Sequence, residues 1–245
     1  MKDIALALEG VHTHIGQYHI LHGVDLRVPE GEVFVLLGRN GAGKSTTLRT
    51  IMQLWKASQG RISYRGDELI GRGTPSLADL GIAYVPETTG VFSTLTVGEN
   101  LLLAARRART TRELDTARLD WIFELFPALK KFWMFPAGKL SGGQKQMLSV
   151  ARAICEPRAL LLIDEPSKGL APAMVTNLVA ALAEMRRQKT TIVLVEQNFS
   201  MAKALGDQVA VLDNGRTVHQ GSMEDLARDD ALQRQLLGLH LGAHQ

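Results

Sequence analysis

Short, continuous apolar runs alternate with longer amphipathic stretches along the chain. Three of these runs, at residues 33–37, 159–163 and 191–195, contain no charged residue. Runs of this length without alternation are typical of strands that are covered on both faces, and such strands occur mostly in parallel sheets flanked by helices. The pattern therefore predicts an α/β fold with a largely parallel sheet.

The segment between Thr96 and Lys139 has no strand pattern. Its apolar residues recur at helical spacing with charged residues between them, as in residues 119–126. The stretch at 223–239 also has helical character. We expect a single domain, 1–245, with a core at 1–94 and 140–221, a helical subdomain at 95–139 and a C-terminal helical tail at 222–245.

The composition of the chain indicates the compartment in which the protein works. Apolar residues make up 45% of the chain and charged residues 22%, which is the balance of a soluble globular protein. Cys155 is the only cysteine, so an intrachain disulfide is excluded and a reducing compartment is favoured. The chain begins at Met1 without the cationic head and apolar core of a secretion signal, so we expect it to be cytoplasmic.

The positive charge of the chain is small and scattered. The net charge is +3, and the densest basic cluster lies at 106–109. This cluster is interpreted as a solvated helix end, with a site facing lipid headgroups as the alternative. Electrostatics alone therefore do not indicate nucleic-acid binding.

A glycine-rich segment directly follows the first apolar run and matches the pattern G-x-x-x-x-G-K-[ST]. Its glycines allow backbone N–H groups to converge on phosphate oxygens, and the helix that follows adds a partial positive charge. Lys44 is predicted to bridge the β- and γ-phosphates of ATP and to act in catalysis, and Ser45 to give Mg²⁺ a hydroxyl ligand. The predicted ATP-binding residues of this phosphate loop are Gly38, Arg39, Asn40, Gly41, Ala42, Gly43, Lys44, Ser45 and Thr46.

Two carboxylates, Asp164 and Glu165, directly follow the second apolar run. Ligands of open α/β sheets gather at the carboxyl ends of the strands. Asp164 is predicted to hold Mg²⁺, directly or through water. Glu165 is predicted to orient the attacking water or to accept its proton, which makes it a candidate catalytic residue.

These two motifs fit any P-loop ATPase, and a third motif narrows the class. Residues 140–144, Leu-Ser-Gly-Gly-Gln, resemble the signature sequence of ABC ATPases and precede Asp164 at that family's spacing. Physically, a serine and two glycines ahead of an apolar helix form a second anion receptor. The resemblance implies a P-loop NTPase (RecA-like) core with an antiparallel N-terminal β subdomain and an α-helical insertion. It also implies that the signature binds ATP held by another subunit, through Ser141, Gly142, Gly143 and Gln144.

Three further segments, at 85–87, 169–172 and 195–198, are similar to the ATPases of branched-chain amino-acid importers, in particular the shorter LivF-like type. The resemblance implies that Glu87, where most ABC ATPases have glutamine, reaches Mg²⁺ and the attacking water. A solvated loop position is the alternative for this residue. Gln197 stands where the wider family has histidine, and we hypothesise that it acts in hydrolysis as a neutral sensor of the γ-phosphate.

The family usually has an aromatic residue before a glycine near the N-terminus, where it stacks on adenine. Here Ile15 precedes Gly16. Tyr18 is the predicted substitute and His14 a weaker one. Ile15 could instead cover the base by apolar contact, and Tyr18 could be an ordinary strand residue.

The resemblance implies the ATP-hydrolysing subunit of an importer that takes up branched-chain amino acids or related small solutes through separate membrane subunits. The expected cofactors are ATP and Mg²⁺. The expected partners are a second ABC ATPase (a LivG-like paralogue or a second copy), two membrane permeases and, indirectly, a solute-binding protein, with no nucleic acid. The expected location is the cytoplasmic face of the inner (plasma) membrane. The alternative, a soluble ABC ATPase acting on nucleic acid or the ribosome, is disfavoured by the short insertion and the single copy of each motif.

Overall fold

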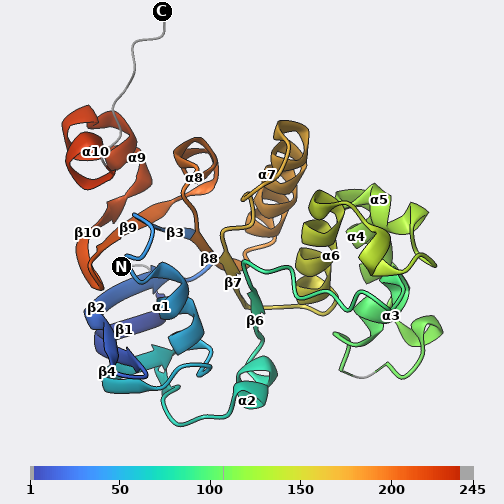
Figure 1. The fold of residues 1–245 in the computed structure, drawn as a ribbon, viewed down its shortest axis with the longest axis horizontal. Coiled ribbons are helices and arrows are strands. Elements are labelled where there is room, and N and C mark those ends of the chain that lie inside the picture. The colour runs from blue at the N-terminus through green and yellow to red at the C-terminus, as the bar shows by residue number, and fades with distance from the viewer. Residues whose placement is uncertain (1–2, 107, 238–245) are drawn as a thin grey trace, which may run out of the picture.

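The computed structural model describes residues 3–106 and 108–237, and their strands form two sheets (Figure 1). Residues 1–2, 107 and 238–245, which include the start of the chain and the end of the predicted tail, lie outside the described part. The smaller sheet is antiparallel, as the sequence resemblance predicts. Its strands, in the order β2-β1-β4-β5, are β1 Ile4–Ile15, β2 Tyr18–Pro29, β4 Ala57–Tyr64 and β5 Asp67–Glu68.

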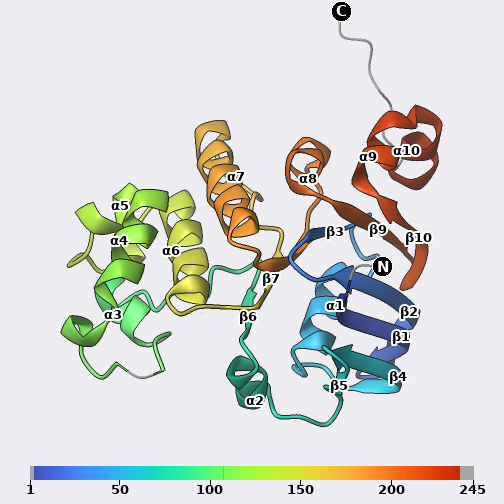
Figure 2. The same ribbon diagram turned by 180° about the vertical axis from the view of Figure 1, so that it is seen from behind.

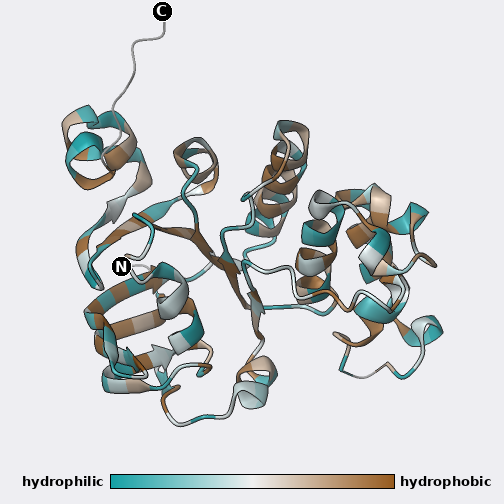
Figure 3. Cartoon of the chain, in the orientation of Figure 1, coloured by the Kyte–Doolittle hydropathy of each residue, from teal (hydrophilic) through white to brown (hydrophobic). Residues whose placement is uncertain are grey.

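The larger sheet is mainly parallel, and only β10 runs antiparallel to its neighbour. All three apolar runs form central strands of this sheet, and Figure 3 shows hydrophobic residues along them. In the order β10-β9-β3-β8-β7-β6, the strands are β3 Val33–Gly38, β6 Ile82–Val85, β7 Leu160–Asp164, β8 Thr191–Val195, β9 Gln208–Asp213 and β10 Arg216–Ser222.

Helices cover both faces of the larger sheet. Their bounds are α1 Lys44–Ile51, α2 Thr74–Asp79, α3 Val97–Leu102, α4 Thr116–Leu125, α5 Pro127–Lys131, α6 Gly142–Ile154, α7 Pro172–Arg187, α8 Phe199–Leu205, α9 Met223–Arg228 and α10 Asp230–Leu237, with 3₁₀ turns at Thr111–Glu113 and Ala137–Lys139. Within the described residues, no helix is long and apolar enough to cross a bilayer.

Two hydrophobic cores lie on the opposite faces of the larger sheet. Alternate residues of β3 show the division, because Val35 packs with α6, α7 and α8, whereas Phe34 packs with α1 and the antiparallel sheet. Strand residues that are buried on both sides cannot be polar without losing hydration, which explains the continuous apolar runs. The α/β fold expected from the sequence is confirmed.

Helices α3, α4, α5 and α6 gather at one end of the molecule, beyond β6 (Figures 1 and 2). Helix α3 begins at a capping box, in which the Thr96 hydroxyl accepts from the Glu99 N–H and the Glu99 carboxylate accepts from the Thr96 N–H. Asn100 is fully buried and fastens the loop before this helix. Its Oδ1 accepts from the Phe92 N–H at 2.9 Å, and its Nδ2 donates to the carbonyl oxygens of Phe92 and Thr96 at 3.0 and 2.9 Å.

The cysteine, the basic cluster and the C-terminal tail each have a defined place in the structure. Cys155 is buried beside the helical end, as a core residue should be. In the basic cluster at 106–109, Arg106 forms an ion pair with Asp79. The predicted C-terminal helix is interrupted, because Asp229 leaves the helical conformation (φ −101°, ψ 90°), so the described part of the tail forms α9 and α10.

Candidate functional site

The phosphate loop connects β3 to α1, and its shape depends on glycine at two positions. Gly38 has φ +147°, and a Cβ there would lie 2.3 Å from the carbonyl oxygen of Leu212. Gly43 has φ +101°, and its Cβ would lie 2.8 Å from a methyl group of Leu21. Neither position accepts a side chain without movement of a neighbour.

Lys44 is the first residue of α1, and its ammonium is held across the loop. Its Nζ donates to the carbonyl oxygens of Gly38 at 2.9 Å and Arg39 at 3.1 Å. The side chain is buried, and Nζ lies 3.7 Å from Oε1 of Glu165. The loop residue Ala42 is also buried, so it contributes to packing rather than to the open face of the loop.

Asp164 ends β7 and receives two hydroxyl groups. Ser45 Oγ donates to Asp164 Oδ1 at 2.9 Å, and the Tyr84 hydroxyl donates to Oδ2 at 3.3 Å. Burial raises the pKa of Asp164, and these two hydrogen bonds oppose the rise. Burial and the nearby Asp164 raise the pKa of Tyr84 to about 12, so its hydroxyl stays a donor at neutral pH. A carboxylate beside a hydroxyl provides the hard oxygen ligands that Mg²⁺ prefers, so the residues fit that ion.

Glu165 follows with a left-handed backbone, φ +46°, and its N–H donates to the carbonyl oxygen of Val195 at 2.9 Å. This conformation is uncommon for a residue with a side chain. Its Oε1 accepts a hydrogen bond from Gln197 Nε2 at 2.6 Å. The structure thus brings together the three predicted catalytic residues, Lys44, Glu165 and Gln197.

Glu196 joins the segments that follow β7 and β8. It is buried, and its carboxylate accepts from the N–H groups of Ser167, Gln197 and Asn198 at 3.1–3.2 Å and from the Ser167 hydroxyl at 2.9 Å. Burial raises the pKa of Glu196, and the hydrogen bonds oppose the rise. These contacts hold the backbone of Gln197 in place opposite Glu165.

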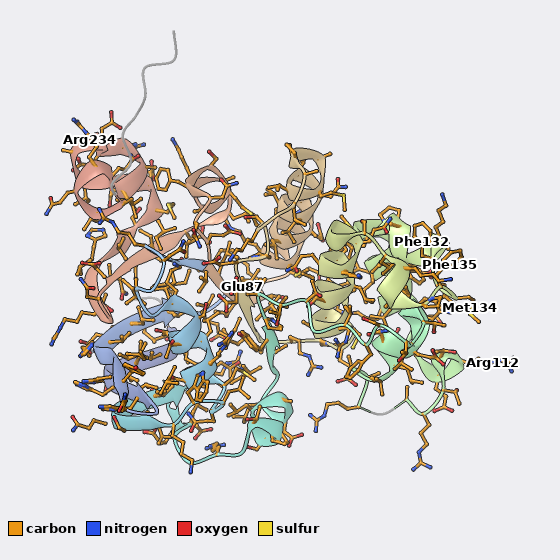
Figure 4. The ribbon with its side chains drawn as sticks, viewed as in Figure 1. Glu87, Arg112, Phe132, Met134, Phe135 and Arg234 are labelled. Atoms are coloured by element: carbon orange, nitrogen blue, oxygen red, sulfur yellow. The ribbon has the colours of Figure 1, made fainter. Side chains whose placement is uncertain are left out.

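Glu87 lies after β6, near the centre of the molecule between the strands and the helical end (Figure 4). Its Oε1 lies 2.5 Å from the ammonium of Lys168, which is itself 3.8 Å from Glu165 Oε2. A cavity of about 340 Å³ opens at this point. It is lined by Ile20, Asn40, Gly41, Gly43, Lys44, Ser45, Thr46, Glu87, Glu165 and Lys168.

The signature residues lie apart from this cavity. Ser141 is exposed and caps α6, because its Oγ accepts from the Gln144 N–H at 3.3 Å and the Gln144 side chain accepts from the Ser141 N–H at 2.9 Å. Gly143 packs closely on α7, where an added Cβ would lie 2.7 Å from Met174. Among the described residues that line the phosphate-loop cavity, none comes from the signature 141–144.

The adenine candidates have less support from the geometry. Tyr18 is 67% exposed, and neither it nor His14 lines the cavity. His14 instead stacks on His19, with ring centroids 4.1 Å apart. The apolar wall beside the phosphate loop is Ile20, which sequence reasoning missed because a register shift between β1 and β2 decides which residue faces the loop.

The larger sheet has a phosphate loop after β3 and an acidic pair at the end of β7. This arrangement defines a P-loop ATPase. The sequence model of the family described as ABC transporter matches residues 21–168, and the chain belongs to this family. ATP hydrolysis is the activity of the family, so the chain is an ATP-binding and ATP-hydrolysing subunit, as predicted.

Two curated relatives are similar over most of their length. The chain is 42% identical over 213 residues to BraG of Pseudomonas aeruginosa, a high-affinity branched-chain amino acid transport ATP-binding protein. The aligned region covers 87% of this chain and 91% of BraG. The chain is 34% identical over 224 residues to LivF of Archaeoglobus fulgidus, a probable branched-chain amino acid transport ATP-binding protein, covering 91% and 94%. The predicted likeness to the LivF-like type is confirmed.

The fold also matches solved ABC cassettes. A dimeric bacterial ABC transporter cassette superposes with a TM-score of 0.80 at 24% identity, covering 89% of this chain and 98% of that one. The predicted ABC ATPase fold is therefore confirmed.

Proposed function

We propose that this chain hydrolyses MgATP to drive the import of branched-chain amino acids or related small solutes through separate membrane subunits. The observation that carries the proposal is the convergence of Lys44, Asp164, Glu165 and Gln197 at the carboxyl ends of neighbouring strands. The substrate class is supported by the 42% identity to BraG.

Each residue of the site has a distinct role in this proposal. Lys44 and the N–H groups of the phosphate loop bind the β- and γ-phosphates. Asp164, Ser45 and Glu87 hold Mg²⁺, which neutralises charge on the triphosphate when it is bound. Glu165 orients the attacking water or accepts its proton, and Gln197 fixes that carboxylate and donates toward the γ-phosphate.

The position of Ser141 supports a composite site, in which the signature of one subunit binds the ATP held by another. Ser141 is exposed at the start of a helix and lies outside the phosphate-loop cavity of its own chain. We assign the signature to the ATP held by a partner, either a second copy or a LivG-like paralogue, because a serine hydroxyl and helix N–H groups suit a γ-phosphate. The dimeric cassette of the same fold supports this arrangement.

The permeases and the location follow from the same reasoning. We place the permease contact on the helical subdomain 95–139 and on the loop that contains Glu87. Arg152, in α6, donates to the carbonyl oxygen of Gly90 at 2.5 Å, so movement of the helical end reaches this loop. Two permeases then hold the core, 1–94 and 140–221, at the cytoplasmic face of the inner membrane, with a solute-binding protein on the other side.

The proposal is tested by nucleotide-driven association. Glu165→Gln subunits, with the paralogue and permeases supplied, are expected to dimerise in MgATP and not in MgADP, as measured by sedimentation. Ser141→Arg is expected to abolish this association, because the larger cation blocks the approach of the signature to the triphosphate. The matched control Gln188→Arg alters an exposed residue at the far end of α7 and should associate normally. A failure of MgATP to bring together Glu165→Gln subunits under these conditions would refute the mechanism.

A further inference from the structure

One cation of the cavity has no part in the roles described above. Lys168 lies on the segment after β7, and its Nζ contacts Glu87 Oε1 at 2.5 Å and approaches Glu165 Oε2 at 3.8 Å. These carboxylates lie on the segments that follow different strands, β6 and β7, so the lysine connects two segments that are distant in sequence. The Lys168 side chain is 62% exposed, whereas that of Glu165 is only 9% exposed.

The backbone of Lys168 is fixed, and its side chain has room to move. The Lys168 N–H donates to the carbonyl oxygen of Glu165 at 3.2 Å, and the preceding Ser167 is held by the buried Glu196. The four-carbon stem of lysine is flexible and carries a compact charge. The ammonium can therefore leave Glu87 without any change in the backbone.

Lys44 does not substitute for this cation at Glu87. Its ammonium is occupied by the carbonyl oxygens of Gly38 and Arg39, and among the described residues its ion pair is with Glu165. Lys168 is thus the cation that forms an ion pair with Glu87, whereas Arg49 interacts with that carboxylate only electrostatically.

We propose that Lys168 is a positioning residue that competes with Mg²⁺ for Glu87. The ammonium pairs with Glu87 while the nucleotide is absent, and it leaves Glu87 when MgATP enters. The ammonium occupies Oε1 of Glu87 at 2.5 Å, and its positive charge repels a second cation at that carboxylate, so it opposes metal binding there. This inference rests on the proposed function, because it requires Glu87 to face the metal.

Metal binding, rather than turnover, tests the competition. Mn²⁺ would be titrated into the full-length protein with a non-hydrolysable ATP analogue, and bound Mn²⁺ would be measured by electron paramagnetic resonance. Lys168→Met is expected to lower the half-saturating Mn²⁺ concentration about three- to five-fold, the size of effect typical of a partly exposed ion pair. Lys168→Arg keeps the charge and should stay near the wild type. Lys203→Met removes an exposed lysine of α8 and is the matched control.

Two further measurements separate competition from other effects. In a Glu87→Gln background, Lys168→Met should shift Mn²⁺ binding less, because the contested carboxylate is gone. Analogue affinity in EDTA should change less than about two-fold, the range for loss of an exposed charge. Unchanged or weaker Mn²⁺ binding in Lys168→Met, or a full shift in the Glu87→Gln background, overturns the inference. A wild-type protein that binds no analogue overturns the proposed function itself.

Discussion

Removal of the Gln197 side chain gives the sharpest prediction about hydrolysis. Its Nε2 donates to Glu165 Oε1 at 2.6 Å, and Glu165 is only 8% exposed, so solvent screens this contact little. A hydrogen bond to a charged group contributes about 1.5–3 kcal/mol. If the contact is used in the transition state, Gln197→Ala should slow hydrolysis about 10- to 150-fold, since about 1.4 kcal/mol corresponds to a factor of ten.

The assay is steady-state phosphate release by the assembled transporter, together with ATP affinity in a non-hydrolysing background. We expect kcat to fall while affinity changes little, because the bond to Glu165 acts in the chemical step and Gln197 adds only one donor to the many groups that bind the phosphates. Gln197→His keeps a donor and should recover part of the rate. Gln188→Ala, an exposed glutamine that bonds to Glu184, is the matched control. Hydrolysis by Gln197→Ala at the wild-type rate would show that this side chain has no catalytic role.

Three predictions concern stability and reactivity. Asn100→Ala should lower the free energy of unfolding, measured by urea titration, by about 2–4 kcal/mol, because it leaves buried backbone groups unpaired. In the same titration the control Asn177→Ala, at an exposed position, should change it by under about 0.5 kcal/mol, and equal effects of the two variants would contradict the prediction. Cys155 is buried and its pKa is raised to about 11, so iodoacetamide should label the native thiol at pH 8 about 100-fold more slowly than the unfolded one; similar rates would show that the thiol is accessible. Burial, together with the nearby His19 and Arg216, lowers the pKa of His22 below 6.5. The unfolded chain therefore binds this proton at a higher pH than the folded chain, and the free energy of unfolding should fall as the pH drops from 6.5 through the lowered pKa. His22→Gln should flatten this dependence of stability on pH, and an unchanged slope would contradict the prediction.

The strands and the phosphate loop were predictable because their determinants are local. Burial on both faces requires a continuous apolar run, so residues 33–37, 159–163 and 191–195 mark β3, β7 and β8 to within one residue. The phosphate loop and the pair Asp164 and Glu165 follow such runs directly, and the carboxyl end of a parallel strand faces the site.

Contacts between distant segments could not be predicted in this way. Tyr84 lies in a strand and reaches Asp164 across 80 positions, and Lys168 reaches Glu87 across 81 positions. Their side chains follow no pattern of hydrophobicity, so only the order of β6 and β7 in the sheet brings them together. The break between α9 and α10 at Asp229 was also not predicted, because the helical spacing of apolar residues continues on both sides of it.

The loops after β6, β7 and β8 form one connected unit. Glu87 is tied to Lys168, Glu165 to Gln197, and Ser167 to Glu196, and the three strands are neighbours in the sheet. The loop of Glu87 continues to Gly90, which accepts a hydrogen bond from Arg152 in the last turn of α6. The same helix carries Ser141 at its start, and a helix moves as a rigid element. Under the proposed function, a rearrangement around the triphosphate is transmitted through these contacts to the signature, so that the two halves of the proposed composite site change together.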